Sequence, residues 1–278
     1  MIEWQQLGGH FGAICPTQTD VMAIPAEEVK QALASHQLLV FPGQRLSTDD
    51  FERFAAGLGE PAEYPYAAPL AGSRYLVPII KEAADQHNFG GAWHTDTSYL
   101  EHPPAVTLLL AREVPASGGD TLFADMYQAF ERLSPGLRHC LSQLDGINTS
   151  ALVHAAVGDY ASVAGDAGAA GAATQATARH PAVRRHPVTG RAALYVSLVH
   201  TERFSGMTRA ESLPLLNYLQ AQATRADNCV RVHWAPGTLA IWDNRCLQHL
   251  PLNDYPGQRR EMHRIILAGE KPLGSRPS

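Results

Sequence analysis

The chain is poor in cysteine, in basic charge and in long apolar runs, and each shortage excludes a class of protein. It has four widely separated cysteines, Cys15, Cys140, Cys229 and Cys246. None belongs to a Cys-x-x-Cys pair, so the pattern favours reduced thiols in the cytoplasm over a disulfide framework or a structural zinc site. The apolar runs, such as 105–111, are far too short to span a bilayer. Residues 1–4 lack the charged and apolar regions of a signal peptide.

An excess of positive charge is missing as well. The formal net charge is −5 and the pI is near 6.2, which argues against nucleic acid or an anionic membrane as the main partner. Hydrophobic residues make up 45% of the chain and charged residues 18%, a balance typical of a folded globular protein. The length of 278 residues is sufficient for a sizeable core. We expect a single domain over residues 1–278, and a homo-oligomer is left open.

One stretch lacks large side chains altogether. Residues 155–178 consist mainly of Ala and Gly and show no periodicity. So few large side chains cannot offset the entropy lost on ordering the segment, which predicts a mobile insertion. A disordered surface loop and a lid over the functional site are both open alternatives.

The rest of the chain alternates short strand-like segments with a few amphipathic helices. Apolar runs and alternating patterns predict strands at 38–41, 74–80, 105–112, 121–124, 192–199, 229–234, 238–243 and 260–268. Helices are expected over 26–35 and 208–223, after Asp125 and Ser134, and from an N-cap at Ser47 or Thr48 to Gly57 or Gly59. In these helices Cys140 and Leu213 are among the residues expected to face the core. The pattern favours a mainly β fold with peripheral helices, a β-sandwich or jelly roll.

The stretch 93–99, Trp-His-Thr-Asp-Thr-Ser-Tyr, has strand-like composition. In an extended strand His94 and Asp96 project from the same face, because residues two apart point the same way. One imidazole and one carboxylate form two adjacent corners of a metal site. A second histidine would complete the 2-His-1-carboxylate triad of a non-haem Fe(II) centre. A lone His-x-Asp is more often a hydrogen-bonded surface pair.

Later in the chain, one histidine and two arginines are suited to complete such a site. His249 is expected in a loop after the strand 239–243, from which it can return to the barrel mouth. Arg260 and Arg264 share one face of the last strand. An inward-facing guanidinium needs an anion, and its fork suits a carboxylate, so the two arginines suggest an anionic co-substrate and an anionic substrate. The alternative is that both arginines pair with Asp or Glu on a solvated face.

Five separated motifs occur together and in the order of a known family: Trp93-His94-Thr95-Asp96, Gly118-Gly119-Asp120-Thr121, Trp242-Asp243-Asn244-Arg245, Gln248-His249 and Gln258-Arg259-Arg260-Glu261-Met262-His263-Arg264. In these motifs the chain resembles the taurine dioxygenase-like (TauD/TfdA) family, from about residue 38 to 272. Members of this family are Fe(II)- and 2-oxoglutarate-dependent oxygenases. The resemblance therefore implies Fe(II), 2-oxoglutarate as co-substrate and O₂. It also implies the family fold, the double-stranded β-helix, which agrees with the strand pattern.

Carried over by position, the resemblance gives each candidate residue a role. His94, Asp96 and His249 would hold the iron and form the catalytic centre. Arg260 would pair with the distal carboxylate of 2-oxoglutarate, and the Thr121 hydroxyl would hydrogen-bond the same group. Charge-assisted hydrogen bonds of this kind are worth about 1.5–3 kcal/mol each, enough to select a dicarboxylate over a neutral ligand.

On the substrate side the family places the second arginine, here Arg264, near an anionic group of the primary substrate. Tyr64 stands where taurine-oxidising members carry a histidine that contacts the sulfonate, and Gly90 stands where they carry a polar residue. Trp93, directly before His94, is a further candidate for substrate contact. The two departures argue against taurine and leave alkyl sulfates, aryloxyalkanoates and biosynthetic metabolites open.

The resemblance implies a dioxygenase that hydroxylates a small anionic substrate and releases succinate and CO₂. Two other functions compete with it. A zinc hydrolase or lyase on the same jelly roll would work without 2-oxoglutarate and O₂, and Arg260 and Thr121 argue against it. A catalytically silent binding module would tolerate loss of a metal ligand, whereas all three are present.

Overall fold

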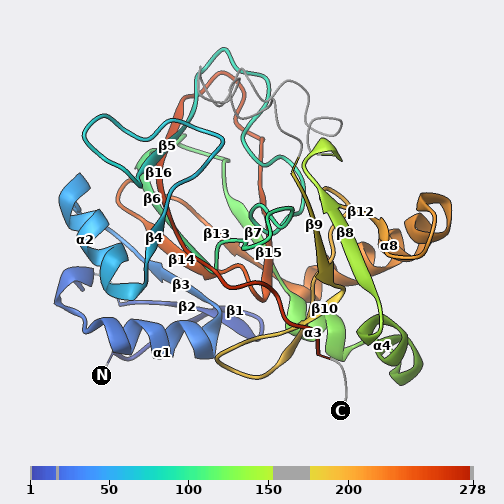
Figure 1. Ribbon diagram of the computed structural model, residues 1–278. Helices are drawn as coiled ribbons and strands as arrows, with labels where there is room; N and C mark the ends of the chain where they lie inside the picture. Colours follow the sequence, from blue (N-terminus) through green and yellow to red (C-terminus); the bar gives the residue numbers. More distant parts are fainter. Residues whose placement is uncertain (1, 17–18, 153–175, 276–278) are drawn as a thin grey trace.

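Two β-sheets of unequal size face one another and define the molecule (Figure 1). The structure is a computed structural model that describes residues 2–16, 19–152 and 176–275. The large sheet has eight strands in the order β1-β2-β3-β14-β6-β16-β4, with β5 paired to β16. These strands are β1 (Gln5–Gly8), β2 (Phe11–Ile14), β3 (Leu38–Phe41), β4 (Pro61–Ala62), β5 (Val77–Lys81), β6 (Val106–Glu113), β14 (Leu239–Asp243) and β16 (Arg260–Leu267).

Three smaller sheets complete the β structure. The one that faces the large sheet has the order β13-β7-β15, and a second three-stranded sheet has the order β12-β8-β9. Their strands are β7 (Thr121–Asp125), β13 (Cys229–Val232), β15 (Leu247–Pro251), β8 (Asp145–Thr149), β9 (Thr177–Pro181) and β12 (Thr201–Phe204), and a hairpin joins β10 (Val183–Arg185) to β11 (Ala192–Leu194). In the large sheet and the smaller ones alike, the strands pair antiparallel, as a jelly roll requires. The exception is the parallel pair β2 and β3 of the large sheet.

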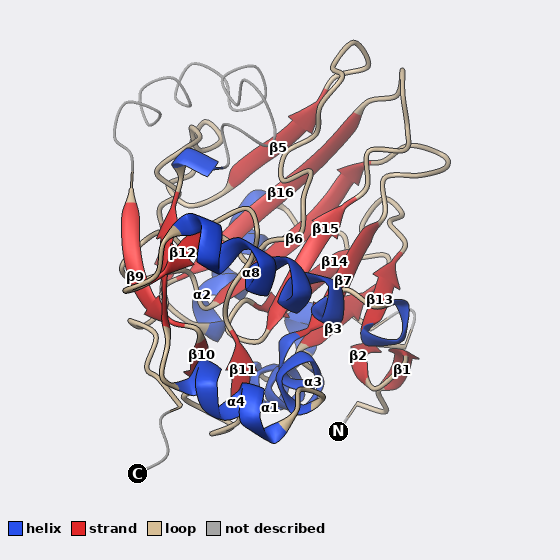
Figure 2. Cartoon of the chain, turned by 90° about the vertical axis from the view of Figure 1, so that its right-hand side faces the viewer, coloured by secondary structure: helices blue, strands red, loops and turns tan. Residues whose placement is uncertain are grey.

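The helices lie outside the sheets, as Figure 2 shows for α1, α3, α4 and α8. They are α1 (Ala26–His36), α2 (Thr48–Leu58), α3 (Met126–Glu131), α4 (Pro135–Ser142) and α8 (Arg209–Ala223), with short 3-10 turns at Val21–Ala23 and Ala226–Asn228. Side chains cap their N-termini: Ser47 accepts from Asp50 N, Asp125 accepts from Tyr127 N, and Thr208 forms a capping box with Glu211. The mainly β architecture with peripheral helices is therefore confirmed.

The middle of strand β6, residues 108–111, is continuously apolar. Leu108 and Leu110 belong to a core cluster that includes Val29 and Phe51 of the outer helices. Leu109 and Ala111 belong to the other cluster, between the two sheets. This part of the strand is thus buried on both faces, so apolar residues occupy every position from 108 to 111 rather than every second one.

Several local predictions are wrong. Residues 93–99 form no strand: His94 makes an isolated β-bridge, and a turn follows from Asp96 to Tyr99. His249 lies in strand β15 and not in a loop. Cys140 is exposed on α4, and Leu213 is 41% exposed on α8, because the inner faces of these helices are already filled by Leu141 and by Leu216 and Leu219.

The Ala/Gly-rich insertion predicted at 155–178 lies outside the described residues except for 176–178, of which 177 and 178 begin strand β9. All four cysteines are free, in agreement with the prediction of reduced thiols. Among the described helices, none has the length and apolar character needed to cross a membrane.

Candidate active site

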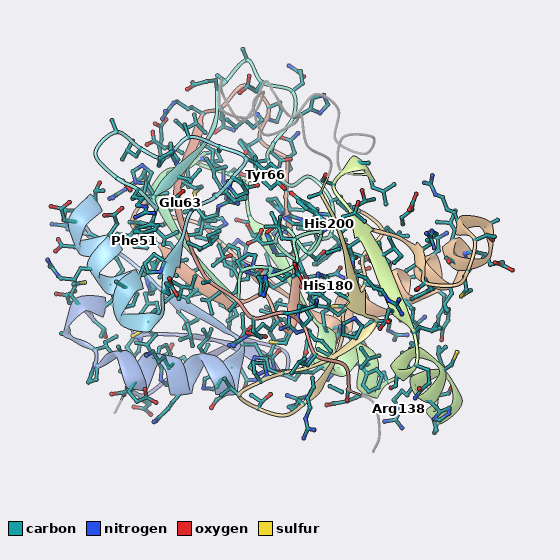
Figure 3. The ribbon with its side chains drawn as sticks, in the orientation of Figure 1. Phe51, Glu63, Tyr66, Arg138, His180 and His200 are labelled. Atoms are coloured by element: carbon teal, nitrogen blue, oxygen red, sulfur yellow. The ribbon has the colours of Figure 1, made fainter. Side chains whose placement is uncertain are left out.

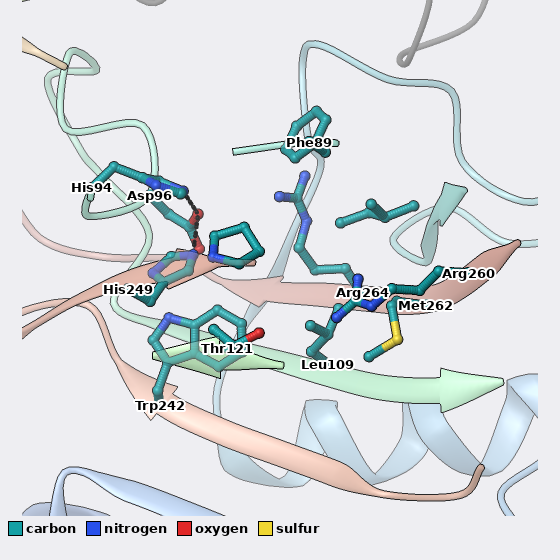
Figure 4. A pocket seen from close by; sticks show the side chains of 12 residues that line it. Phe89, His94, Asp96, Leu109, Thr121, Trp242, His249, Arg260, Met262 and Arg264 are labelled. Atoms are coloured by element: carbon teal, nitrogen blue, oxygen red, sulfur yellow. Dashed lines mark ion pairs between the residues drawn. The ribbon is translucent and has the colours of Figure 1, made fainter. Parts of the chain in front are cut away.

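His94, Asp96 and His249 meet at the mouth of the space between the two facing sheets. Their potential ligand atoms all lie within 4.8 Å of one another, and all three residues are buried. Asp96 Oδ1 is 3.8 Å from His94 Nε2 and 3.8 Å from His249 Nε2, as the dashed lines in Figure 4 show. The three residues predicted to form a metal site are therefore brought together with their ligand atoms converging.

The backbone that carries His94 and Asp96 is a bridge followed by a tight turn. The bridge pairs His94 with His249, and the Thr95 hydroxyl donates to Leu247 O at 2.9 Å, which ties the turn to β15. Thr97 has a φ of 37°, a left-handed conformation that is rare outside glycine. This turn aims Asp96 back toward His94, so the two side chains project together as predicted, although not from a regular strand.

The surroundings of the three residues suit a divalent metal ion. His94 Nδ1 lies 2.6 Å from Ala92 O, so the ring proton is on Nδ1 and Nε2 keeps its lone pair. Burial lowers the pKa of His94, and burial together with the neighbouring His94 lowers the pKa of His249 to about 3. Both rings are thus neutral at physiological pH.

Asp96 supplies the negative charge. Burial by itself raises the pKa of this carboxyl, but His249, Arg264, His94 and a hydrogen bond from Thr107 outweigh burial, and the pKa is lowered. Two neutral imidazoles and one carboxylate form the donor set of a non-haem Fe(II) centre with open positions. The chemistry of the site therefore fits this metal.

A second buried cluster of possible ligands, His186, Asp243 and Cys246, is saturated by protein hydrogen bonds. His186 Nε2 lies 2.9 Å from Asp243 Oδ2, and His186 Nδ1 accepts from two backbone N–H groups. Arg245 donates to both oxygens of Asp243. These bonds hold the loop that connects β14 with β15, and they engage both ring nitrogens of His186 and both carboxylate oxygens of Asp243.

The cavity beside the three ligands extends along the inner face of β16. Its lining residues, drawn in Figure 4, are Ile79, Phe89, His94, Asp96, Leu109, Thr121, Trp242, His249, Pro251, Arg260, Met262 and Arg264. Arg260, Met262 and Arg264 alternate along β16, so the predicted shared face of this strand is the cavity wall.

Arg260 and Thr121 form the deep end of the cavity and present unused donors to it. Arg260 is 7% exposed, and its Nε and Nη2 have no hydrogen-bond partner among the described residues. Trp234 Nε1 donates to Thr121 Oγ1 at 3.0 Å, so the Thr121 hydroxyl proton is free to point elsewhere. Burial lowers the pKa of Arg260, as expected for a cation that lacks a close anion.

Arg264 lies nearer the metal ligands and packs against two neighbouring aromatic rings. Its guanidinium carbon is 3.9 Å from the ring centre of Tyr64 and 5.2 Å from that of Phe89. The residue is 4% exposed, and its Nε and Nη2 are also without a partner in the described part of the chain. The two ring centres are 6.2 Å apart, so the rings meet at one side of the guanidinium, and its free Nε and Nη2 remain to bind an anion.

Arg259, directly before β16, shows the solvated ion pairs that the sequence left open as an alternative for Arg260 and Arg264. Arg259 forms ion pairs with Glu82, Glu113 and Glu261 at the surface. Arg260 and Arg264 form none of that kind in the described residues. The alternative of solvated ion pairs is therefore wrong for both.

Gly90 places backbone directly against the metal-binding edge of His94. Its φ is +79°, and a Cβ at this position would lie 2.7 Å from His94 Cε1 and 3.2 Å from His94 Nε2. Glycine is needed here both for the left-handed backbone and for the close approach.

Sequence reasoning located the polar residues of the site but missed most of its apolar wall. Leu109 and Met262 could have been found as alternate positions of predicted strands, whereas Phe89 and Pro251 lie in segments without a pattern. His200 was missed as well: it is buried among interior side chains (Figure 3), and its ring centre is 6.1 Å from that of His94.

Two predicted substrate residues do not line the cavity itself. Tyr64 lies behind the cavity wall, where it contacts the lining residues Arg264 and Phe89. Trp93 is half-buried beside His94, and its role stays a prediction.

Comparison with known proteins places this chain in a family. The sequence profile of the taurine catabolism dioxygenase TauD, TfdA family matches residues 4–266. The chain belongs to this family. It is an Fe(II)- and 2-oxoglutarate-dependent dioxygenase, with Fe(II), 2-oxoglutarate and O₂ as its cofactors, and the double-stranded β-helix expected from the motifs is confirmed.

Individual relatives agree with this membership. The alpha-ketoglutarate-dependent sulfate ester dioxygenase of Pseudomonas putida is 36% identical over 258 residues, which cover 92% of this chain and 84% of the relative. An alkylsulfatase of Acinetobacter baylyi is 31% identical over 99% of this chain and 87% of its own length. The crystal structure of a taurine dioxygenase from Burkholderia xenovorans superposes with a TM-score of 0.80 at 29% identity, covering 99% of this chain and 93% of that one.

Proposed function

We propose that His94, Asp96 and His249 hold the Fe(II) of this dioxygenase, and that Arg260 and Thr121 bind the distal carboxylate of 2-oxoglutarate. Support comes from the three converging ligand atoms and from the unused donors at the deep end of the same cavity. The metal centre, when loaded, supplies the oxidising chemistry, and the protein orients the reactants and excludes water. The chain contributes the open donor set and a guanidinium in position to fix the second carboxylate.

We infer further that the primary substrate is an alkyl sulfate ester. The observation that carries this inference is Arg264: a buried cation, without an ion-pair partner in the described chain, that lies against Tyr64 and Phe89 in the same cavity as the metal ligands. A guanidinium edge with free Nε and Nη2 suits the oxygens of a sulfate. The sulfate ester dioxygenase of P. putida, at 36% identity, supports the same class.

The rest of the wall favours an uncharged hydrocarbon tail. Among the described residues that line the cavity, Asp96 is the only acid, and it is assigned to the metal. A zwitterion such as taurine would therefore have no carboxylate to receive its ammonium group. Ile79, Leu109 and Met262 instead offer apolar contact, which suits an alkyl chain.

The chemistry that follows is oxidative rather than hydrolytic. Hydroxylation of the carbon that bears the ester oxygen gives a hydroxy sulfate ester, which collapses to an aldehyde and inorganic sulfate. The overall conversion takes one alkyl sulfate, one 2-oxoglutarate and one O₂ to one aldehyde, one sulfate, one succinate and one CO₂. Arg264 holds the sulfate end, so the carbon next to it is directed toward the metal ligands.

A substrate panel tests this proposal. The purified protein is supplied with Fe(II), 2-oxoglutarate, air and one of hexyl sulfate, hexanesulfonate or taurine, and succinate, sulfate and aldehyde are quantified. We expect succinate and sulfate in equal amounts from hexyl sulfate, and at least about 100-fold lower kcat/KM for taurine, as for a ligand with one unpaired buried charge. Preference for taurine or hexanesulfonate would overturn the substrate class. Sulfate released with hexanol and without 2-oxoglutarate would instead indicate the hydrolase.

The remaining predictions concern the setting of the enzyme. The four free cysteines agree with the cytoplasmic location predicted from cysteine usage. That location, the homo-oligomeric state and the absence of a nucleic-acid partner stay predictions.

A further inference from the structure

A chain of three hydrogen bonds runs from the core to the outer oxygen of Asp96. Trp242 Nε1 donates to Asn244 Oδ1 at 3.0 Å, Asn244 Nδ2 donates to Thr107 Oγ1 at 2.8 Å, and Thr107 Oγ1 donates to Asp96 Oδ2 at 2.5 Å. We call these three residues the Trp242–Asn244–Thr107 relay. Thr107 is fully buried, and Asn244 and Trp242 are 1% and 2% exposed, so water does not compete for these bonds.

The direction of every proton in the relay is fixed by its first member. An indole N–H can only donate, so the Asn244 side chain must present its oxygen to Trp242 and its NH₂ to Thr107. A hydroxyl carries one proton, and the oxygen of Thr107 is already an acceptor. The Thr107 proton therefore points to Asp96 Oδ2, which accepts it.

The relay makes the two oxygens of Asp96 unequal. Oδ2 is engaged by Thr107, whereas Oδ1 is the oxygen that lies 3.8 Å from both imidazole Nε2 atoms. The strands hold the relay in place: Thr107 on β6 is the register partner of Trp242 on β14, and Asn244 N donates to Ala105 O at 2.9 Å.

We propose that the Trp242–Asn244–Thr107 relay is a positioning device that keeps Asp96 a one-oxygen ligand. This inference rests on the proposed role of Asp96 as a metal ligand. A carboxylate that turned both oxygens to the metal would occupy one of the positions that the three-residue centre leaves open. By engaging Oδ2, the relay keeps that position for the co-substrate or O₂, and it fixes the side-chain rotamer before metal arrives.

The test measures metal binding without turnover. Mn(II) is titrated into metal-free protein under anaerobic conditions and followed by EPR, and Co(II) is added separately to record its ligand-field spectrum. We expect Thr107→Val, which keeps the shape but removes the hydroxyl, to weaken Mn(II) binding 10- to 100-fold and to alter the Co(II) spectrum. Thr107→Ser restores the donor and should restore both. Asn244→Asp offers a second acceptor to Thr107, competes with Asp96 for its proton, and should behave like Thr107→Val.

Thr201→Val is the matched control. Thr201 is a buried threonine on β12 whose hydroxyl also bonds an asparagine, Asn148, at 2.7 Å. Its loss should lower the melting temperature without changing Mn(II) affinity or the Co(II) spectrum. Unchanged metal binding in Thr107→Val, or equal weakening in Thr201→Val, would overturn the relay.

Asp96→Ala separates this inference from the function on which it rests. If wild-type protein binds Mn(II) and Asp96→Ala does not, the ligand set holds, and the Thr107 variants decide the relay alone. If Asp96→Ala binds Mn(II) as tightly as the wild type, the assignment of Asp96 fails, and the relay fails with it.

Discussion

The main chains of His94 and His249 hydrogen-bond to each other in both directions. His94 N donates to His249 O at 3.1 Å, and His249 N donates to His94 O at 2.8 Å. Two imidazoles from distant parts of the sequence are thereby held together by backbone alone, and their ring centres are 4.2 Å apart. The convergence of the ligands does not depend on a metal ion, which leads to the first prediction.

Removal of metal should leave the fold intact. Protein treated with a chelator should keep its far-UV circular dichroism and unfold in one cooperative transition. Added Mn(II) should then raise stability by mass action, by about 2.7 kcal/mol at a free concentration of 100 times Kd. Differential scanning calorimetry with and without Mn(II) checks this, and loss of the cooperative transition in the metal-free protein would contradict it.

Substitution of Arg260 should act on the co-substrate. Arg260→Ala removes a fork whose charge-assisted hydrogen bonds are worth about 1.5–3 kcal/mol each, so the Kd for 2-oxoglutarate should rise by about 100-fold or more. The measurement is anaerobic titration of 2-oxoglutarate into the Fe(II)-loaded protein. Arg259→Ala is the matched control, because Arg259 directly precedes the same strand and forms its ion pairs at the surface. Equal effects of the two variants would reassign Arg260 to a structural role.

Gly90→Ala should impair metal binding for a steric reason. The new Cβ would lie 2.7 Å from His94 Cε1, so either the ring or the backbone must shift. Gly206→Ala is the control, because Gly206 has a similar φ of +83° but open space around its Cβ position. Both variants carry the backbone strain of about 1 kcal/mol, and only Gly90→Ala should weaken Mn(II) binding in an EPR titration. Metal affinity unchanged in Gly90→Ala would show that the segment moves aside freely.

Acid should destabilise the metal-free protein through its buried histidines. Burial, with the neighbouring His94, lowers the pKa of His200 to about 3 from the ordinary histidine value of 6.5, as it does for His249. Between these values the unfolded chain binds more protons than the folded one, so stability is present above about pH 6.5 and falls as the pH drops toward 3. The loss is on the order of 2 kcal/mol per histidine at pH 5.

Urea unfolding of the metal-free protein at pH 7, 6 and 5 measures this dependence. His200→Gln should reduce its slope by about 1.4 kcal/mol per pH unit, the contribution of one proton. His139→Gln, on the exposed surface of α4, should leave the slope unchanged. A slope in His200→Gln equal to that of the wild type would contradict the prediction.

The residues of the site could be predicted from the sequence more accurately than the backbone conformation that carries them. Alternation in 260–268 placed Arg260 and Arg264 on one face correctly, because a period of two is a local property that side-chain pattern reveals. The turn at Asp96–Tyr99 could not be found in this way. Thr97 adopts its left-handed conformation because the bridge to β15 and the Asp96 contacts impose it, against the strand-like composition of its neighbours.

The other features that the sequence did not predict depend on contacts between residues far apart in the chain. Nothing local reveals that Thr107, in a continuous apolar run, faces Asp96, or that Phe89 covers Arg264. The motif 242–245 was recognised, but the part that Asn244 plays between Trp242 and Thr107 became visible only when β6 and β14 were seen side by side.

The two rings over Arg264 belong to connections and not to strands: Tyr64 lies between β4 and β5, and Phe89 between β5 and β6. The metal ligands and the relay, by contrast, are tied to paired backbone of the two sheets. Changes in the connecting segments can therefore alter substrate selectivity while the metal ligands and the relay stay unchanged. Such a division would let one scaffold diversify through its loops alone.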